Sequence, residues 1–415
     1  MKQFEIAHQI LLRLVRDEVP FALVLRQTFK KMDCDPVTKS NITALLGCEL
    51  RHHLIFDNLM KRFIEEDIDF AKTIYLRFYL SNLLFLRRFE DDELLKLAIE
   101  ELDEDSVMDL VKFVKSTNEI IPEEYDKASP EYLSLRYNTP AWIIRMWQKQ
   151  YGKGLVFKVL KVNYRASIAS LRLRTKEITV EEFLGKHPDY SVAPVSDMVL
   201  YQGRGNAKSL EELKEHKIFF MKMGTKYVLD QLELSPLKSL AIYSETLNNI
   251  FLDINARFGD DYPIDFVINH SSAIYDARKL RTELGLDKLY LYESNSEGLL
   301  SCLSKKVDTF ICVPKNSMLD LLRSTPDYFL YIKQNQLDEL IANETKCLED
   351  CAKFVAPEGQ LVYMIPTLSR KESNSLIANF LVSHPEFSLI EEQQLFPFDS
   401  YDSCLYYARM KRNGE

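Results

Sequence analysis

The feature that most constrains the fold of this chain is a change in the spacing of its apolar residues. In the first part they recur every three to four positions, as at Phe4, Ile10 and Leu14, which indicates amphipathic helices. In the last part, short apolar runs alternate with helical segments, and this alternation predicts a parallel, doubly wound sheet. We therefore expect a multidomain α and α/β protein, with an all-helical bundle followed by an α/β domain.

The segment between these two parts is mixed. Thr139 suits a helix N-cap, Pro140 suits the first helical turn, and Gly152 is expected to end that helix. Strands are predicted at Leu155–Val162 and Ser170–Arg174, and an antiparallel edge strand is predicted at Cys404–Lys411. The chain is thereby divided into a helical domain (1–125), a small α+β module (126–215) and an α/β domain (216–415).

Composition restricts the setting and the partners. The 7 cysteines form an odd set without repeating spacing, which argues against a disulfide framework and for a reducing cytoplasm. No apolar run is long enough to span a bilayer, so no membrane partner is expected. The net charge of -9 means that any nucleic-acid contact must come from local basic patches. Only 12 residues are glycine, which leaves few places where the backbone can approach a phosphate or cofactor closely.

Several segments, in order, resemble the Sun/Fmu family of bacterial ribosomal-RNA 5-methylcytosine methyltransferases. Thr139–Ile144 resembles the family's His-Pro-Ser-Trp-Leu-Leu segment, and Leu171–Thr175 resembles the Leu-Arg-Ile-Asn strand that follows it. Gly359–Tyr363 is similar to the Gly-Thr-Leu-Val-Tyr strand, and residues 42–88 are similar to the central helices of the family's NusB-like domain. The resemblance covers nearly the whole chain. It implies a NusB-like RNA-binding bundle, a small RNA-binding-type module and a Rossmann-like domain for S-adenosylmethionine (SAM).

The same resemblance marks the positions of the family's two cysteines. Cytosine C5 becomes nucleophilic only after a thiolate adds to C6, so the reaction requires a cysteine. The family's Leu-Val-Tyr-Ala-Thr-Cys-Ser corresponds to Leu361–Thr367, which places Pro366 at the nucleophile position. Its Asp-Ala-Pro-Cys-Ser corresponds to Val313–Ser317, which places Asn316 at the second cysteine; a one-residue shift would place Lys315 there. We therefore expect a pseudoenzyme without catalytic residues at these positions.

The cofactor loop of the family is altered as well. Both of its glycines are replaced, by Leu247 and Asn248, and the acidic residue that binds the ribose hydroxyls falls at Asn269. Glu293 offers a substitute contact to the adenine. We expect no cofactor, because SAM binding is predicted to be lost at a loop whose degenerate positions are Ser244, Glu245, Thr246, Leu247, Asn248 and Asn269.

The remaining cysteines are interpreted as packing residues. Cys347 and Cys351 are spaced i,i+4 on one helix face, without a histidine or acidic partner at metal spacing. Cys312 lies inside a predicted buried strand, where a thiol is usually inert. We therefore expect no metal.

Three functions remain open. The first is a pseudoenzyme that keeps RNA binding, with ribosomal RNA as the partner. The second is a protein-interaction or regulatory module, which the acidic charge favours, and the third is an active methyltransferase with a rebuilt site. Candidate RNA contacts are Arg51, Lys61, Arg62, Arg87, Arg88, Arg172 and Arg174.

Overall fold

A computed structural model describes residues 2–32, 34–64, 67–165, 167–203, 207–245, 248–259, 262–399, 401–402 and 404–414. These residues divide into two compact units. The first consists of residues 1–166 together with the later segment 321–332, and the second consists of residues 167–320 and 333–415. The expected small module, residues 126–215, is therefore shared between the two units.

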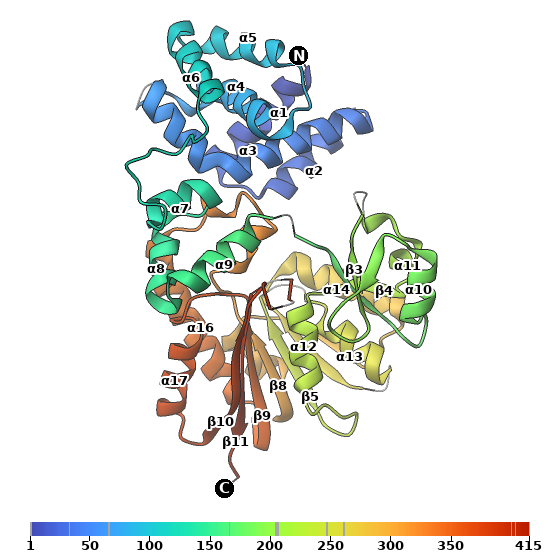
Figure 1. The fold of residues 1–415 in the computed structure, drawn as a ribbon. Coiled ribbons are helices and arrows are strands. Elements are labelled where there is room, and N and C mark those ends of the chain that lie inside the picture. Colours follow the sequence, from blue (N-terminus) through green and yellow to red (C-terminus); the bar gives the residue numbers. More distant parts are fainter. Residues whose placement is uncertain are drawn as a thin grey trace. The chain divides into compact units, whose positions relative to one another are not determined.

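The first unit is helical (Figure 1). Asp35 illustrates how its helices begin: its carboxylate accepts hydrogen bonds from the amides of Val37 and Thr38, and Pro36 occupies the first turn. Its helices are α1 (Lys2–Asp17), α2 (Phe21–Lys31), α3 (Pro36–Phe63), α4 (Phe70–Ser81), η1 (Asn82–Leu86), α5 (Asp91–Glu101), α6 (Glu104–Ser116), α7 (Pro130–Tyr137), α8 (Ala141–Tyr151) and α9 (Lys153–Asn163). The all-helical bundle expected for this part of the chain is confirmed.

Two expectations for this unit are wrong. Helix α8 begins one residue later than expected, because the Pro140 carbonyl accepts a hydrogen bond from the Ile144 amide, so Pro140 and not Thr139 is the N-cap. Leu155–Val162, predicted as a strand, lies within helix α9. Val156, Val159 and Leu160 are buried there at helical spacing, so the β-branched residues that favoured a strand in fact form the inner face of a helix.

The later segment 321–332 belongs to the helical unit through specific contacts. Buried Asp327 accepts a hydrogen bond from the Phe21 amide at 2.8 Å, although the two residues are 306 positions apart. The Tyr331 hydroxyl donates to the Val19 carbonyl at 2.9 Å. This segment carries the short helix η5 (Tyr328–Leu330), and Phe329 packs near the ring of His53.

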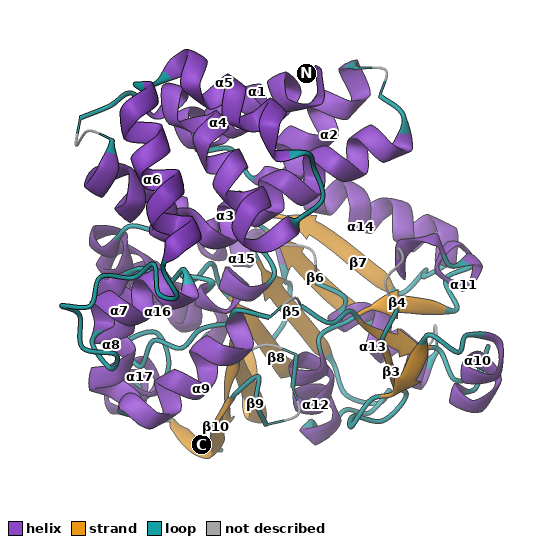
Figure 2. Cartoon of the chain, turned by 45° about the horizontal axis from the view of Figure 1, so that its top comes forward, coloured by secondary structure: helices purple, strands orange, loops and turns teal. Residues whose placement is uncertain are grey.

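The second unit contains two sheets (Figures 1 and 2). The smaller sheet is antiparallel, in the order β2-β3-β1-β4. Its strands are β1 (Ser170–Leu173), β2 (Tyr190–Val192), β3 (Met198–Tyr201) and β4 (Ile218–Phe220), and it is accompanied by α10 (Val180–Lys186), η2 (Ala207–Ser209), α11 (Glu211–Lys214) and α12 (Met223–Gln231).

The larger sheet has the order β10-β11-β9-β8-β5-β6-β7, and strands β9, β8, β5, β6 and β7 are parallel. The alternating strand and helix pattern predicted this doubly wound arrangement. The strands are β5 (Leu240–Ser244), β6 (Ile264–Ile268), β7 (Leu289–Glu293), β8 (Val307–Val313), β9 (Val355–Ile365), β10 (Phe387–Leu395) and β11 (Leu405–Arg412). The helices are α13 (Ile250–Phe258), α14 (Ser271–Leu284), η3 (Ser296–Gly298), α15 (Leu299–Cys302), η4 (Leu319–Arg323, which crosses the division between the units), η6 (Gln334–Gln336), α16 (Leu337–Ala352) and α17 (Asn374–Ser383).

Each face of the larger sheet packs against its own set of helices. Apolar residues of α12, α13 and α14 cover one face, and residues of α15, α16 and α17 cover the other. Strand β11 is antiparallel as expected, but it is not an edge strand, because β10 pairs with its outer side. Strand β10 was not predicted from the sequence, because residues Glu391–Gln394 are all polar and do not alternate with apolar residues.

Candidate functional site

The carboxyl ends of the parallel strands bring most of the expected site positions to one edge of the larger sheet. The Asn269 amide donates to the Ser244 carbonyl, and the Glu245 amide donates to the Val313 carbonyl. The ends of β5, β6 and β8 are thus tied together, as expected for the edge at which ligands bind in open α/β sheets. Thr246 and Leu247 lie outside the described residues.

Glu245 is the main polar group at this edge. Its carboxylate accepts hydrogen bonds from the Tyr243 hydroxyl at 2.6 Å and from the Asn269 side-chain amide at 2.9 and 3.1 Å. On the next strand, Glu293 accepts from the Ser271 hydroxyl at 2.6 Å. Asn269 occupies the position at which the Sun/Fmu family has an acidic residue. The Glu245 carboxylate lies directly beside it. The edge therefore carries two carboxylates, Glu245 and Glu293, with further acceptor capacity.

The loop after β5 leads into helix α13. The Asn248 side chain accepts a hydrogen bond from the Ile250 amide at 3.2 Å, which satisfies one of the free amides at the start of the helix. Asn249 donates to the Phe220 carbonyl of the smaller sheet at 2.5 Å. Asn248, expected only as the replacement of a glycine, thus has a structural role in ordering this helix start.

The two positions that correspond to cysteines lie in loops after β8 and β9. Asn316 is 7% exposed, and its side chain is engaged within its own loop: it donates to the Pro314 carbonyl and accepts from the Met318 amide. Pro366 is half-buried directly after β9. A side-chain amide and a pyrrolidine ring have no nucleophilic electron pair comparable with a thiolate.

A buried carboxylate joins these two loops. Glu372 accepts hydrogen bonds from the Ser317 amide at 2.7 Å, from the Ser317 hydroxyl at 2.8 Å and from the Thr367 hydroxyl at 2.9 Å. Ser317 directly follows Asn316, and Thr367 directly follows Pro366. Because an unsatisfied buried carboxylate is costly, these hydrogen bonds hold both loops in a defined geometry.

A second polar group, buried Asp402, contacts residues that line a groove. Asp402 accepts from the Ser170 hydroxyl at 2.5 Å and from the Met223 amide at 3.0 Å, and the Lys222 ammonium lies 4.0 Å from its carboxylate. The groove of about 210 Å³ is lined by residues 167–170, Phe220, Met221 and Lys222. Burial raises the pKa of nearby Asp320 to about 8; Lys222 opposes this shift and Asp402 adds to it.

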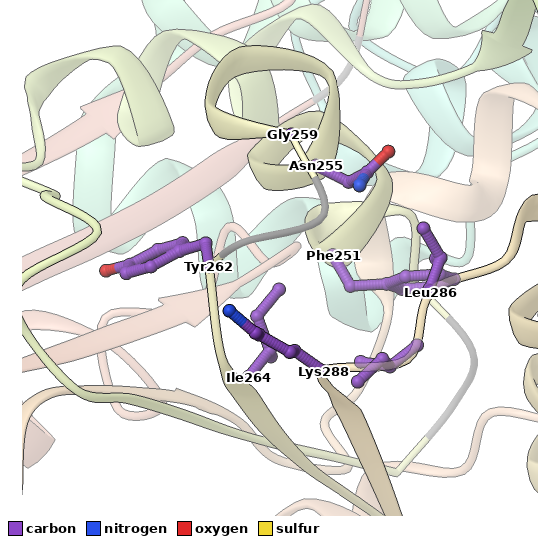
Figure 3. Close-up of a pocket in the computed structure, with 8 residues that line it drawn as sticks. Phe251, Asn255, Gly259, Tyr262, Ile264, Leu286 and Lys288 are labelled. Atoms are coloured by element: carbon purple, nitrogen blue, oxygen red, sulfur yellow. The ribbon is translucent and has the colours of Figure 1, made fainter.

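Figure 3 shows a different cavity, lined by Phe251, Asn255, Tyr262, Ile264 and Lys288 among others. It lies at the amino ends of β6 and β7, the edge opposite to Glu245. The space amounts to about 10 Å³, which is room for about one water molecule. This cavity is a packing gap and not a ligand site.

In the helical unit, aromatic and basic side chains gather on one surface. The His52 and Phe85 rings stack with centroids 3.5 Å apart, and Tyr164 lies against His52 at 5.7 Å. Tyr137 contacts both Tyr164 and Phe157. We call these five rings, with Arg51, Arg136 and Lys161, the aromatic–basic surface; they come from α3, η1, α7 and α9.

The exposure and charge of this surface set it apart from a core cluster. Phe85, Phe157 and Tyr164 are 40%, 40% and 37% exposed, and the Lys161 ammonium lies 4.4 Å from the Phe157 ring centroid. Burial, together with the positive charges of Arg51 and Arg136, lowers the pKa of His52 to about 3. His52 is therefore a neutral aromatic ring at physiological pH, held beside two guanidinium groups.

The other expected RNA contacts are dispersed. Arg87 and Arg88 are exposed after η1, and Arg88 donates to the Ser40 hydroxyl at 3.1 Å. Lys61 and Arg62 are exposed on the last turn of α3, where Arg62 covers the ring of Phe113.

Arg172 of strand β1 and Arg174 directly after it are engaged within the second unit. Arg172 is 1% exposed and bonds to buried Asp253 at 2.7 Å, which ties β1 to helix α13. Arg174 donates to Asn255 of the same helix. Both side chains hold the two sheets of the unit together. Tyr137, Phe157 and Tyr164 of the aromatic–basic surface were not singled out from the sequence, because Tyr164 meets His52 only through the packing of helices that are far apart in the chain.

Comparison with known proteins gives a result only at the level of structure. No protein-family model matches the sequence, and no curated protein matches it. The protein PH0851 is 16% identical, with 99% of each chain covered and a TM-score of 0.80. NSun6 from Pyrococcus horikoshii with SFG is 10% identical, with 66% of this chain and 98% of that chain covered and a TM-score of 0.59. A methyltransferase homolog protein from Pyrococcus horikoshii is 14% identical, with 68% and 97% covered and a TM-score of 0.57.

These likenesses show that the chain has a multidomain α/β architecture with a Rossmann-like methyltransferase fold, as expected. They also correct one prediction. The expected loss of SAM binding is contradicted, because NSun6, which has this fold, was solved with SFG, an analogue of SAM. In the fold, the Glu245 carboxylate accepts hydrogen bonds from Asn269, a contact between two strands that the separate sequence positions do not show.

No helix among the described residues is long and apolar enough to cross a membrane.

The pKa of Asp320 leads to a first prediction. The folded-state pKa lies above the ordinary value of 3.8, so the stability linked to this proton is fully present below about pH 4 and is lost progressively as pH rises to about 8. We expect Asp320→Asn, which mimics the protonated acid, to gain on the order of 3 kcal/mol of stability relative to the wild type between pH 5 and pH 9. Urea unfolding at both pH values measures this difference. Equal pH dependence of the two proteins would contradict it.

Proposed function

We propose that this chain is an RNA-binding protein with a SAM-binding methyltransferase fold, and that it does not carry out cysteine-dependent methylation of cytosine C5. The observation that carries the proposal is the aromatic–basic surface of the helical unit. Exposed rings and guanidinium groups side by side are the elements with which proteins bind unpaired nucleotides: bases stack on the rings and phosphates pair with the cations.

The composition of the surface supports RNA more than a protein partner. Its aromatic rings are accompanied by Arg51, Arg136 and Lys161, and Arg87 extends the positive charge beyond η1. The chain has a net charge of -9, so the positive charge of this surface is a local feature. Arg172 and Arg174 are not part of the proposed surface, because each is engaged with helix α13.

The reaction part of the proposal follows from chemistry. Methyl transfer to cytosine C5 by covalent catalysis begins with a thiolate at C6, and the two corresponding positions hold Asn316 and Pro366. The side chain of Asn316 is hydrogen-bonded inside its loop. The loops themselves stay ordered through Glu372, so what is changed is the reactive group and not the scaffold around it.

The cofactor part rests on the edge of the larger sheet. Glu245 and Glu293 are carboxylates at the ends of β5 and β7, and they could accept hydrogen bonds from the ribose hydroxyls and the adenine of SAM. Asn269 orients Glu245 by donating to both of its oxygens. When bound, SAM supplies an electrophilic methyl group.

RNA binding is tested by fluorescence anisotropy with structured ribosomal-RNA fragments. We expect Phe85→Ala to weaken binding by roughly 10- to 100-fold, since stacking contributes about 1–3 kcal/mol per base. Tyr275→Ala is the matched control, because Tyr275 is 70% exposed on α14 in the other unit, and its loss is expected to leave affinity unchanged. The wild-type affinity is expected to fall with salt. Salt-independent binding, or an equal loss of affinity in Phe85→Ala and Tyr275→Ala, would contradict the proposal.

Cysteine-dependent chemistry is tested with RNA that carries 5-fluorocytosine, in the presence of SAM. In an enzyme that adds a thiolate to C6, fluorine at C5 blocks release and the RNA stays covalently attached. We expect no covalent complex in denaturing electrophoresis, at concentrations where anisotropy shows the RNA to be bound. A covalent complex that Cys312→Ser abolishes would show that another cysteine has taken over the reaction.

The cofactor edge is tested by calorimetry with SAM. We expect the wild type to bind, and Glu245→Gln to bind at least about 10-fold more weakly, since hydrogen bonds to charged groups contribute about 1.5–3 kcal/mol. Glu386→Gln, an exposed acid just before β10, is the control and is expected to bind as the wild type does. Failure of the wild type to bind SAM, or equal affinity of the three proteins, contradicts this assignment.

A further inference from the structure

Three cysteines converge in the core of the second unit. Cys312 lies on β8, and Cys347 and Cys351 lie one turn apart on α16, which packs over this face of the sheet. Their sulfur atoms all lie within 4.8 Å of one another, and the Cys312 and Cys347 sulfurs are 3.7 Å apart. All three side chains are buried, at 0%, 5% and 0% exposure.

The register of the sheet explains why the thiol of β8 meets the helix. Cys312 is paired with Tyr243 of β5 on one side and with Tyr363 of β9 on the other. Both tyrosines belong to the same apolar core as the three cysteines. A small side chain between two large ones leaves a depression, and α16 fills it with Cys347 and Cys351, which lie one turn apart and so on one face of the helix.

The separations match those of a metal–thiolate site. A zinc–sulfur bond is about 2.3 Å long, so sulfurs around one ion at tetrahedral or trigonal angles are about 3.7–4.0 Å apart. The Cys312–Cys347 distance already has this value, and the third sulfur needs only a small shift. A disulfide would use two of the three thiols, and the pair on α16 cannot form one readily, because residues spaced i,i+4 hold their Cβ atoms about 5–6 Å apart whereas a disulfide needs about 3.8 Å.

Acidic side chains lie near the three cysteines. Glu344 lies one turn before Cys347, is 0% exposed, and interacts electrostatically with Cys312. Neither of its carboxyl oxygens has a hydrogen-bond partner within bonding distance among the described residues. Glu245 and Asp350 also act electrostatically on Cys312. Three thiolates in this buried core would repel one another without a positive ion, and a bound metal ion would balance their charge.

We propose that Cys312, Cys347 and Cys351 form a buried site for one thiophilic d¹⁰ metal ion, Zn²⁺ or Cu⁺. Thiolate ligands select these ions over harder cations. Binding replaces the three thiol protons by three metal–sulfur bonds, so up to three protons are released for each ion bound. The site links β8 to α16 inside the core and departs from our expectation of no metal, since the sequence showed all three cysteines but not that the strand cysteine lies against the two on the helix.

The test uses the full-length protein, reduced and freed of metal with a chelator. Zn²⁺ and Cu⁺ are titrated separately in competition with chromophoric indicators, and Co²⁺ is added to detect sulfur-to-metal charge-transfer absorption. We expect one ion per chain and proton release on binding. We also expect at least about 100-fold weaker binding in Cys347→Ser, since even indirect partners of a metal site contribute 10- to 100-fold. Cys34→Ser, a buried cysteine of the helical unit, is the control and is expected to bind as the wild type does.

A second measurement keeps the proposal testable if Cys347→Ser does not fold. In the wild type, the ion is expected to protect three cysteines from alkylation under mildly denaturing conditions, and peptide mapping identifies them. Absence of one-to-one binding of either ion would overturn the proposal. So would protection of other cysteines, or a Cys312–Cys347 disulfide in the purified protein with no metal bound after reduction.

Discussion

The pairing of strand β8 with β5 and β9 is the constraint on which the rest of the second unit depends. Because β8 is covered by helices on both faces, most of its side chains are apolar, and its backbone groups pair with its two neighbours. The resulting register sets Cys312 between Tyr243 and Tyr363 and brings the ends of β5, β6 and β8 to one edge. The same strand pairing therefore forms both the polar edge with Glu245, which begins at Val313, and the cluster of cysteines around Cys312.

Much of this arrangement could be predicted from the sequence, and the failures have physical causes. Alternating apolar runs and helical segments were sufficient for the parallel strands, because strands buried on both faces are read directly as apolar runs. Leu155–Val162 was misread since β-branched residues also line the inner face of a helix such as α9. Strand β10 was missed because an edge strand needs few apolar residues; its side chains from Ser388 to Gln394 are exposed or half-buried.

The candidate sites could not be predicted from single sequence positions, because each site joins residues from distant segments. The substitution at Asn269 was visible in the sequence, but the carboxylate of Glu245 beside it depends on how β5 and β6 pair. The aromatic–basic surface joins residues from four helices, and no local pattern connects His52 with Tyr164. In the same way, the spacing of Cys347 and Cys351 is local, whereas Cys312 joins them only through packing of α16 on the sheet. Interactions between distant segments were the part that sequence reasoning lacked.

The segment 321–332 has a consequence for how the protein is made. It belongs to the helical unit, where Asp327 caps the Phe21 amide and Tyr331 binds the Val19 carbonyl, yet it follows strand β8 in the chain. A ribosome adds about 5–20 residues per second. Segment 321–332 is therefore completed roughly 10–30 s after helix α9 has been synthesised. During that interval the amide of Phe21 and the surface that receives Phe329 remain uncovered. The nascent helical bundle is therefore a natural client for chaperones until the sheet is half complete.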